Sequence, residues 1–309
     1  MSGDIAVRTI VPLFLIIGLG FFSRRLGIMK QGDEKVLNAF VYFFALPALF
    51  VVNLSETQFT ADNLRFMAAG IVPIVIAVLF FAALRLVLRL SRDIFYLLIL
   101  STVFGSLAFF GIPFIIFAYP GIESEHYATL AVASISPVSV FCSITALELY
   151  SLETLRFLTG IGNVARRLVR NPLILSIVCG AVLSLAGLSI PQPVSRALHM
   201  LGGTTSTVAL FLLGAFLYGR RYTNLKTAFA LSLLRILLLP LIALITVGFF
   251  HLQGLERSTV LLMHAMPTAI SLIVLSERYH FFQETIASLV LISSLGAAVY
   301  LNFWLFLAS

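Results

Sequence analysis

Charged residues are scarce in this sequence, and acidic residues are scarcer than basic ones. Lys, Arg, Asp and Glu make up 11% of the 309 residues, whereas about 25% of the residues in a soluble domain are charged. Hydrophobic residues make up 60%, against roughly 45–50% in a soluble domain. A soluble chain could not bury so much apolar surface, so the composition indicates an integral membrane protein.

Several chemical signatures are missing as well. The sequence has no cluster of metal ligands, no phosphate-binding loop and no low-complexity tract, so we expect neither a metal nor a cofactor. No Asp lies deep in an apolar stretch, although a cation–proton antiporter needs an acidic group there. No deep pair of Asp residues and no Ser–His or Ser–Lys pair points to an intramembrane enzyme.

Long apolar runs use up nearly the whole chain. A membrane-spanning helix needs about 20 predominantly apolar residues, and runs of that length recur ten times. The predicted helices 1 to 10 lie at 5–23, 35–54, 65–90, 94–119, 127–150, 171–188, 196–219, 227–250, 257–278 and 284–308. We therefore predict an all-α polytopic membrane protein with ten transmembrane helices and no soluble domain of useful size.

The basic residues are distributed unevenly along the chain. Of the 20 Lys and Arg residues, 15 fall in the loops after predicted helices 1, 3, 5, 7 and 9. The positive-inside rule places these loops in the cytoplasm and both chain termini outside it. We expect an inner or plasma membrane protein whose net charge of +7 reflects topology and contact with anionic lipid. Nucleic acid is not an expected partner.

The two halves of the chain resemble each other weakly. Matching residues at an offset of 160 are Pro12 and Pro172, Gly20 and Gly180, and Gly27 and Gly187. Because each half has five helices, an odd number, the second half must enter the membrane with the opposite orientation. We predict a first five-helix repeat at 1–150, a cytoplasmic linker at 151–170 and an inverted second repeat at 171–309.

The fourth predicted helix of each half contains a proline. Pro113 follows Gly111 in helix 4, and Pro267 lies in helix 9. A proline removes a helical hydrogen bond, so each helix has either an ordinary kink or a true break. If both helices break, each proline suits the first position of a new half-helix, and two half-helix N-termini meet as a site for a carboxylate. Such matched interruptions in inverted repeats are typical of secondary transporters.

Neutral hydroxyls and two ionisable groups lie near these prolines. We predict that Ser106, Thr268 and Ser271 bind the substrate, although a helical Ser or Thr also commonly bonds to its own backbone. Arg235 in helix 8 either extends to the membrane interface or supplies a charge to the substrate or the bundle. His264 in helix 9 is either a buried, hydrogen-bonded histidine or a proton-coupling group.

Four motifs resemble the auxin efflux carrier family, within a superfamily like that of bile, arsenite and riboflavin transporters. They are Leu37–Leu49, Phe104–Pro113, Leu234–Pro240 and Ala265–Ala269. The resemblance covers the whole chain and implies two inverted five-helix repeats, with helices 4 and 9 broken and crossing at their prolines. It also implies a scaffold of helices 1, 2, 6 and 7, a transport domain of helices 3, 4, 5, 8, 9 and 10, and a substrate site that includes Asn38 and Gly105.

Members of this family move organic anions: auxin in plants, and small carboxylates such as malonate or malate for many bacterial relatives. Ser106 and Ser271 stand where the family commonly or often has Asn, so the substrate identity stays open. The sequence therefore predicts a secondary active transporter of a small organic anion, and not an enzyme. A coupled proton or sodium ion and a homodimer are left open. The alternatives are a cation–proton antiporter of similar fold and a non-transporting membrane sensor.

Overall fold

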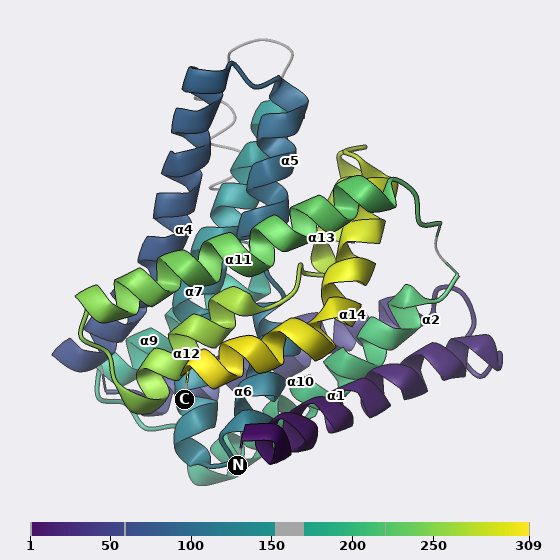
Figure 1. The fold of residues 1–309 in the computed structure, drawn as a ribbon. Helices are drawn as coiled ribbons and strands as arrows, with labels where there is room; N and C mark the ends of the chain where they lie inside the picture. Colours follow the sequence, from purple (N-terminus) through teal and green to yellow (C-terminus); the bar gives the residue numbers. More distant parts are fainter. Residues whose placement is uncertain (1, 59, 152–169, 220, 309) are drawn as a thin grey trace. The chain divides into compact units, whose positions relative to one another are not determined.

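The computed structural model describes residues 2–58, 60–151, 170–219 and 221–308 (Figure 1). Within these ranges the chain is almost entirely helical, and its single strand-like feature is one isolated β-bridge. The predicted linker at 151–170 lies outside the described residues except for Ser151 and Arg170.

Helices occupy each of the ten ranges that the sequence predicts. They are α1 (Ser2–Arg25), α2 (Asp33–Phe40), the π-helix η1 (Val41–Ala45), α3 (Leu46–Glu56), α4 (Ala61–Leu88), α5 (Arg92–Val103), the π-helix η2 (Leu107–Gly111), α6 (Ile112–Ala118), α7 (Ile122–Ser151), α9 (Pro172–Leu185), α10 (Gln192–Leu217), α11 (Leu225–Phe249), α12 (Gly254–Ala265), α13 (Ser271–Arg278) and α14 (Gln283–Ala308).

Six of these helical segments are long and apolar enough to cross a membrane, judged by length and composition. They are Asp33–Glu56, Ala61–Leu88, Ile122–Ser151, Gln192–Leu217, Leu225–Phe249 and Gln283–Ala308. The helices therefore fit a multi-pass membrane protein, whereas the number of ten crossings stays a prediction.

Local sequence signals set the ends of the first helix in each half. Asn171 precedes α9, and its side-chain oxygen accepts a hydrogen bond from the Leu173 N–H at 2.9 Å, which caps the helix. Gly27 and Gly187 follow α1 and α9 with φ angles of 73° and 65°. Such left-handed residues end helices at little cost when they are glycine. These two glycines match at the offset of 160, so they have the same local role in both halves.

The chain folds into two compact units, each drawn from both halves. Unit 1 comprises Met1–Arg65, Leu107–Ala133 and Arg170–Arg220, and unit 2 comprises Phe66–Ser106, Ser134–Val169 and Arg221–Ser309. The helices α4 and α7 contribute residues to both units. The predicted repeats and the predicted scaffold and transport helices divide the chain differently and stay predictions.

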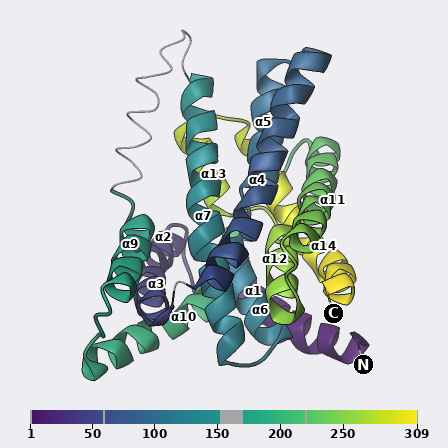
Figure 2. The same cartoon turned by 90° about the vertical axis from the view of Figure 1, so that its left-hand side faces the viewer.

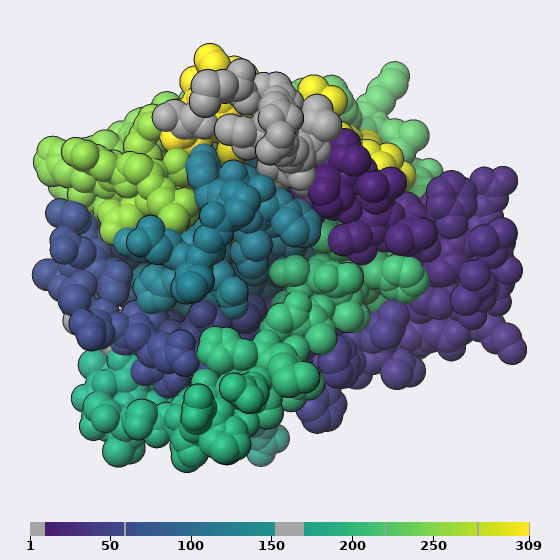
Figure 3. All heavy atoms as spheres, turned by 90° about the horizontal axis from the view of Figure 1, so that it is seen from below, coloured from purple at the N-terminus to yellow at the C-terminus, as the bar shows by residue number. Residues whose placement is uncertain are grey.

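Glycines allow close helix packing in unit 1. A Cβ atom on Gly20 of α1 would lie 1.8 Å from the Phe211 carbonyl oxygen of α10, and one on Gly214 of α10 would lie 1.8 Å from the Ile17 carbonyl oxygen. Gly180 of α9 similarly faces α3, and Figure 2 shows these two helices side by side. In Figure 3 green α10 atoms lie against the purple N-terminal helices. Small residues at helix contacts are typical of membrane bundles.

Two π-helical turns in unit 1 each lead into a proline. η1 is followed by Leu46 and Pro47, and η2 is followed by Ile112 and Pro113. The sequences that precede the two prolines are alike: Phe-Phe-Ala comes before Leu-Pro in one, and Phe-Phe-Gly comes before Ile-Pro in the other. Proline has no N–H for the usual i→i−4 bond, and the wider π-turn accommodates the missing donor without breaking the helix.

Unit 2 is organised around α11, which contacts α5, α12 and α14. The indole N–H of Trp304 in α14 donates to the Ile236 carbonyl oxygen of α11 at 2.9 Å. Next to Ile236, the side chain of Arg235 is 1% exposed. The packing of α11 thus places a cation in the interior of unit 2, where it meets the ends of α5 and α12.

Candidate functional site at two interrupted helices

Two helices of unit 2 are interrupted. α5 ends at Val103, and the chain is not helical from Phe104 to Ser106. α12 ends at Ala265, and α13 begins only after the non-helical segment Met266–Ile270. Pro267 lies in this second segment, where it lacks a backbone N–H for a helical bond. The second interruption therefore lies where the sequence predicts a break.

The two interruptions pair with each other through their backbones. The Ser106 N–H donates to the Pro267 carbonyl oxygen at 2.8 Å, and the Ala269 N–H donates to the Phe104 carbonyl oxygen at 3.0 Å. The bonds flank an antiparallel bridge between Gly105 and Thr268, called the Gly105–Thr268 bridge below. Away from water each backbone polar group needs a partner, and the bridge supplies partners for groups that the broken helices release.

The positions predicted for the helix breaks need two corrections. Gly111 and Pro113 lie inside a helix that runs without interruption through η2 and α6, and the break ends at Ser106, seven residues before Pro113. The prediction of a break at Pro113 is wrong because the π-turn accommodates that proline. Pro267 is not the first residue of a half-helix either, since α13 begins at Ser271.

Arg235 joins the two interrupted helices. Its Nε donates to the Met266 carbonyl oxygen at 2.8 Å, and its Nη1 donates to the Thr102 carbonyl oxygen. Met266 caps the C-terminus of α12, and Thr102 lies in the last turn of α5. Helix C-termini carry unpaired carbonyls and partial negative charge. Arg235 therefore neutralises both ends with bonds worth about 1.5–3 kcal/mol each.

Gly105 provides the space that this arginine occupies. A Cβ atom at Gly105 would lie 2.0 Å from Arg235 Nη2 and 3.0 Å from Cζ. No side chain fits at that distance, so any other residue at position 105 would displace the guanidinium group. The glycine is needed for side-chain clearance, because its φ is not among the positive values in the structure.

Thr268 brings a buried hydroxyl to the bridge. The residue is 0% exposed, and its N–H donates to Ser293 Oγ at 3.2 Å. In the described part of the chain, the hydroxyls of Thr268 and Thr102 have no hydrogen-bond partner. A buried polar group without a partner costs about 1–3 kcal/mol. These two hydroxyls are therefore available to a ligand or to water.

Ser293 was not predicted from the sequence. It lies in α14, and its carbonyl oxygen accepts a hydrogen bond from the Tyr300 hydroxyl at 3.2 Å. The one available signal is the pair Ser293–Ser294 in a mostly apolar helix, a pattern too common to single out. Its role depends on how α14 packs in unit 2.

The structure brings together five of the predicted site residues, Gly105, Ser106, Arg235, Pro267 and Thr268, and places the others elsewhere. His264 is 1% exposed, and its Nε2 lies 2.8 Å from the Gly70 carbonyl oxygen. Ser271 is exposed at the start of α13. Asn38 is partly exposed in α2 and, like Gly111 and Pro113, belongs to unit 1.

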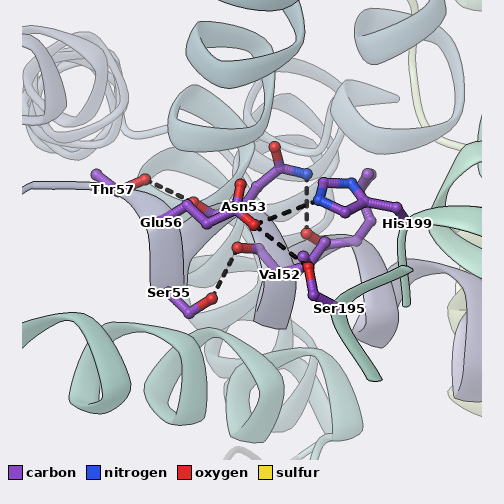
Figure 4. Close-up of polar contacts among 8 residues, drawn as sticks. Val52, Asn53, Ser55, Glu56, Thr57, Ser195 and His199 are labelled. Carbon is purple, nitrogen blue, oxygen red and sulfur yellow. Dashed lines mark hydrogen bonds and ion pairs between the residues drawn. The ribbon is translucent and has the colours of Figure 1, made fainter. Parts of the chain in front are cut away.

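A separate polar cluster lies in unit 1, near the end of α3 and the start of α10 (Figure 4). His199 Nε2 lies 3.3 Å from Glu56 Oε1, and the Ser195 hydroxyl donates to the same oxygen at 3.5 Å. Glu56 and His199 also border a cavity of about 440 Å³, which is lined by Asn53, Glu56, Ile122, Glu123, Glu125, His126, Tyr127 and His199.

This cavity is poorly suited to an anion. Three carboxylates and no Lys or Arg line it among the described residues, and carboxylates repel a second negative charge. In the same described ranges, no group of three or more His, Cys, Asp or Glu side chains is arranged to hold a metal ion. The Gly105–Thr268 bridge is thus the better candidate for anion binding.

The helices and the paired interruptions define a multi-pass membrane protein with an ionisable group at its broken helices. The chain belongs to the membrane transport protein family, which is auxin efflux carrier-like. The sequence model of this family matches residues 5–153 and again residues 153–305. The predicted family resemblance is confirmed, and the chain consists of two repeated halves. Their opposite orientation in the membrane stays a prediction.

Three relatives illustrate this membership. "Uncharacterized transporter MJ1031" of Methanocaldococcus jannaschii is 23% identical over 316 residues, which cover 97% of this chain and 98% of the relative. "Uncharacterized transporter YfdV" of Escherichia coli is 22% identical over 311 residues, with coverages of 98% and 97%. The "Putative malonate transporter" of Rhizobium meliloti is 23% identical over 300 residues, with coverages of 93% and 90%. All three are named as transporters, and none as an enzyme.

Proposed function

We propose that this protein is a secondary active transporter of a small organic anion, which it carries by alternating access at the paired interruptions. The family supports membrane transport, and the name of the Rhizobium meliloti relative makes malonate the first carboxylate to test. Interrupted helices that line a site within the membrane are a common feature of secondary transporters.

The observation that carries the anion class is the buried guanidinium of Arg235 at the Gly105–Thr268 bridge. Two of its nitrogens bond to helix-end carbonyls. A permanently charged group at membrane depth is costly and is functional by default. An anionic substrate would balance this charge during transport, whereas a cationic substrate would be repelled by it.

A cation–proton antiporter is the competing transport function. It needs a buried carboxylate, and Glu148 is the one buried acidic side chain in the described ranges, at 7% exposure. Glu148 Oε1 accepts a hydrogen bond from the Tyr279 hydroxyl at 2.6 Å. No carboxylate occurs in the paired interruptions themselves, which favours the anion. The third alternative, a non-transporting sensor, has no support from the family.

We also propose the organisation that the family resemblance implies. The two halves are inverted repeats, both termini lie outside the cytoplasm, and helices 1, 2, 6 and 7 form a scaffold for the other six. A proton or a sodium ion couples transport to a gradient, and His264 is the candidate proton carrier.

The experiment is flux into proteoliposomes that contain the purified protein. Labelled malonate, malate and monocarboxylates are offered under an imposed pH gradient, an imposed sodium gradient and no gradient. We expect carboxylate flux above that of protein-free liposomes, with one gradient accelerating it. Exchange of cations for protons without any carboxylate flux, from a folded preparation, would establish the antiporter instead.

A further inference from the structure

We infer that Arg235 Nη2 and the Thr268 hydroxyl together hold one carboxylate group of the transported anion, and that Gly105 makes room for this pair. The inference rests on the proposed function and adds the atoms that recognise the substrate. The sequence suggested that backbone N–H groups of two half-helices bind the carboxylate. We infer instead that two side-chain donors on one face of the bridge bind it.

The bridge geometry places these donors side by side. Its two hydrogen bonds join the residues that flank the Gly105–Thr268 pair, so the pair itself is of the non-hydrogen-bonded kind, in which side chains approach most closely. Paired residues project to the same face, with Cβ atoms about 5 Å apart. Arg235 Nη2 lies 2.0 Å from where the Gly105 Cβ would be. It therefore takes the place of a side chain opposite Thr268.

Neither donor atom, Arg235 Nη2 or Thr268 Oγ1, has a hydrogen bond to any other described residue. Nε and Nη1 of Arg235 donate to the Met266 and Thr102 carbonyl oxygens, which leaves Nη2 without a partner in the part of the chain described. The Thr268 hydroxyl is buried and equally without a partner there. A buried charge and a buried hydroxyl on one face form a site that an oxyanion satisfies.

The backbone N–H groups nearby are largely used. The N–H groups of Ser106 and Ala269 form the bridge bonds, and the Thr268 N–H donates to Ser293 Oγ. At the start of α13, the Leu272 and Ile273 N–H groups donate to carbonyls in the preceding turn. The side-chain donors are therefore better placed than these amides to bind a substrate.

The geometry also predicts how many carboxylate groups of the substrate the protein recognises. An arginine fork normally binds a carboxylate through two nitrogens, but here Nε and Nη1 each already donate to a helix-end carbonyl, and Nη2 is the guanidinium nitrogen without a bond among the described residues. One carboxylate oxygen can accept from Nη2, and the other can accept from Thr268. The two donors therefore bind a single carboxylate group, and binding does not require the substrate to carry a second one. Malonate and its monoamide should both bind, whereas malonamide, which has no carboxylate, should not.

Two variants of Thr268 and one of Gly105 test this pair of donors, and a variant of Thr259 is the control. Binding is measured by calorimetry on the purified protein in detergent. Thr268→Val keeps the shape of the side chain and removes a hydroxyl without a partner, so the unliganded fold should be unaffected. We expect its malonate affinity to fall about tenfold or more. Thr268→Ser restores the hydroxyl and should keep the affinity near wild type.

Thr259→Val is the matched control. Thr259 lies in α12, is 0% exposed and has a hydroxyl with no partner among the described residues, but it is not part of the bridge. Its malonate affinity should not change. Gly105→Ala is an independent test of the same pair, because the new Cβ displaces the Arg235 guanidinium. This variant should also bind malonate more weakly than the wild type.

The outcomes separate the inference from the proposed function. If wild type binds malonate and Thr268→Val binds it within twofold as tightly, the donor pair is wrong while carboxylate binding stands. Equal losses in Thr268→Val and Thr259→Val would also overturn the pair. If wild type binds no mono- or dicarboxylate, the proposed function itself fails.

Discussion

The contact between Gly105 and Arg235 allows a quantitative test of how the two interrupted helices are held together. In Gly105→Ala, the new Cβ would lie 2.0 Å from Nη2, so the guanidinium must retreat by about 1.5 Å to reach normal contact distance. Its bond to the Met266 carbonyl oxygen is 2.8 Å long and would stretch beyond the usual limit of about 3.2 Å.

The expected cost follows from the bonds that are lost. Each hydrogen bond from the charged guanidinium is worth about 1.5–3 kcal/mol, so losing one or both lowers the free energy of unfolding by about 1.5–6 kcal/mol. In an Arg235→Met background no guanidinium is present. Adding Gly105→Ala there should cost less than about 0.5 kcal/mol, since the backbone at Gly105 is not in the left-handed region.

The assay is a double-mutant cycle on purified protein in detergent micelles, with denaturant titration followed by circular dichroism. The coupling energy between positions 105 and 235 should be at least about 1.5 kcal/mol. Gly203→Ala in α10 is the matched control, because its Cβ would meet no atom within 4 Å, and alanine should stabilise that helix by about 0.5–1 kcal/mol. Additive effects of Gly105→Ala and Arg235→Met would refute the reasoning.

Three further predictions concern packing and topology. Gly214→Ala brings a Cβ to 1.8 Å from a backbone carbonyl oxygen of α1 and should lower the free energy of unfolding by about 3 kcal/mol or more, whereas Gly18→Ala, with nothing within 4 Å, should not. Tyr279→Phe removes the hydroxyl that donates to buried Glu148 and should cost about 1–3 kcal/mol in the same titration, with malonate affinity unchanged. A reporter fused to either terminus should be accessible from outside intact cells, and accessibility from the cytoplasm alone would contradict the proposed topology.

The sequence predicted the helices well because their signal is local. Apolar runs of the right length recur along the chain, and each of the ten ranges contains helix, although two of them are interrupted. The interruption at Pro267 was also predictable, since proline cannot complete a helical bond. The first interruption, at 104–106, was assigned to Pro113 instead, because the sequence does not show that a π-turn accommodates that proline.

The site depends on contacts that the sequence does not encode locally. Arg235 stood out as a charge in an apolar helix, but its two carbonyl partners lie 31 and 133 residues away along the chain. The clearance provided by Gly105 and the support from Ser293 follow from tertiary packing alone. The sequence identified Thr268 as a hydroxyl near a proline. Its position opposite the Arg235 guanidinium became clear only from the Gly105–Thr268 bridge in the structure.

The central claim is that a carboxylate binds at the Gly105–Thr268 bridge, and substrate protection of an introduced cysteine tests it most directly. Ser106→Cys is made after Cys142 and Cys179 have been replaced, because Cys179 is exposed and would react itself. The rate of alkylation is then measured with malonate, with malonamide and with no addition. We predict that malonate slows the reaction and malonamide does not. A rate that malonate leaves unchanged, in a protein that still transports it, would contradict the account.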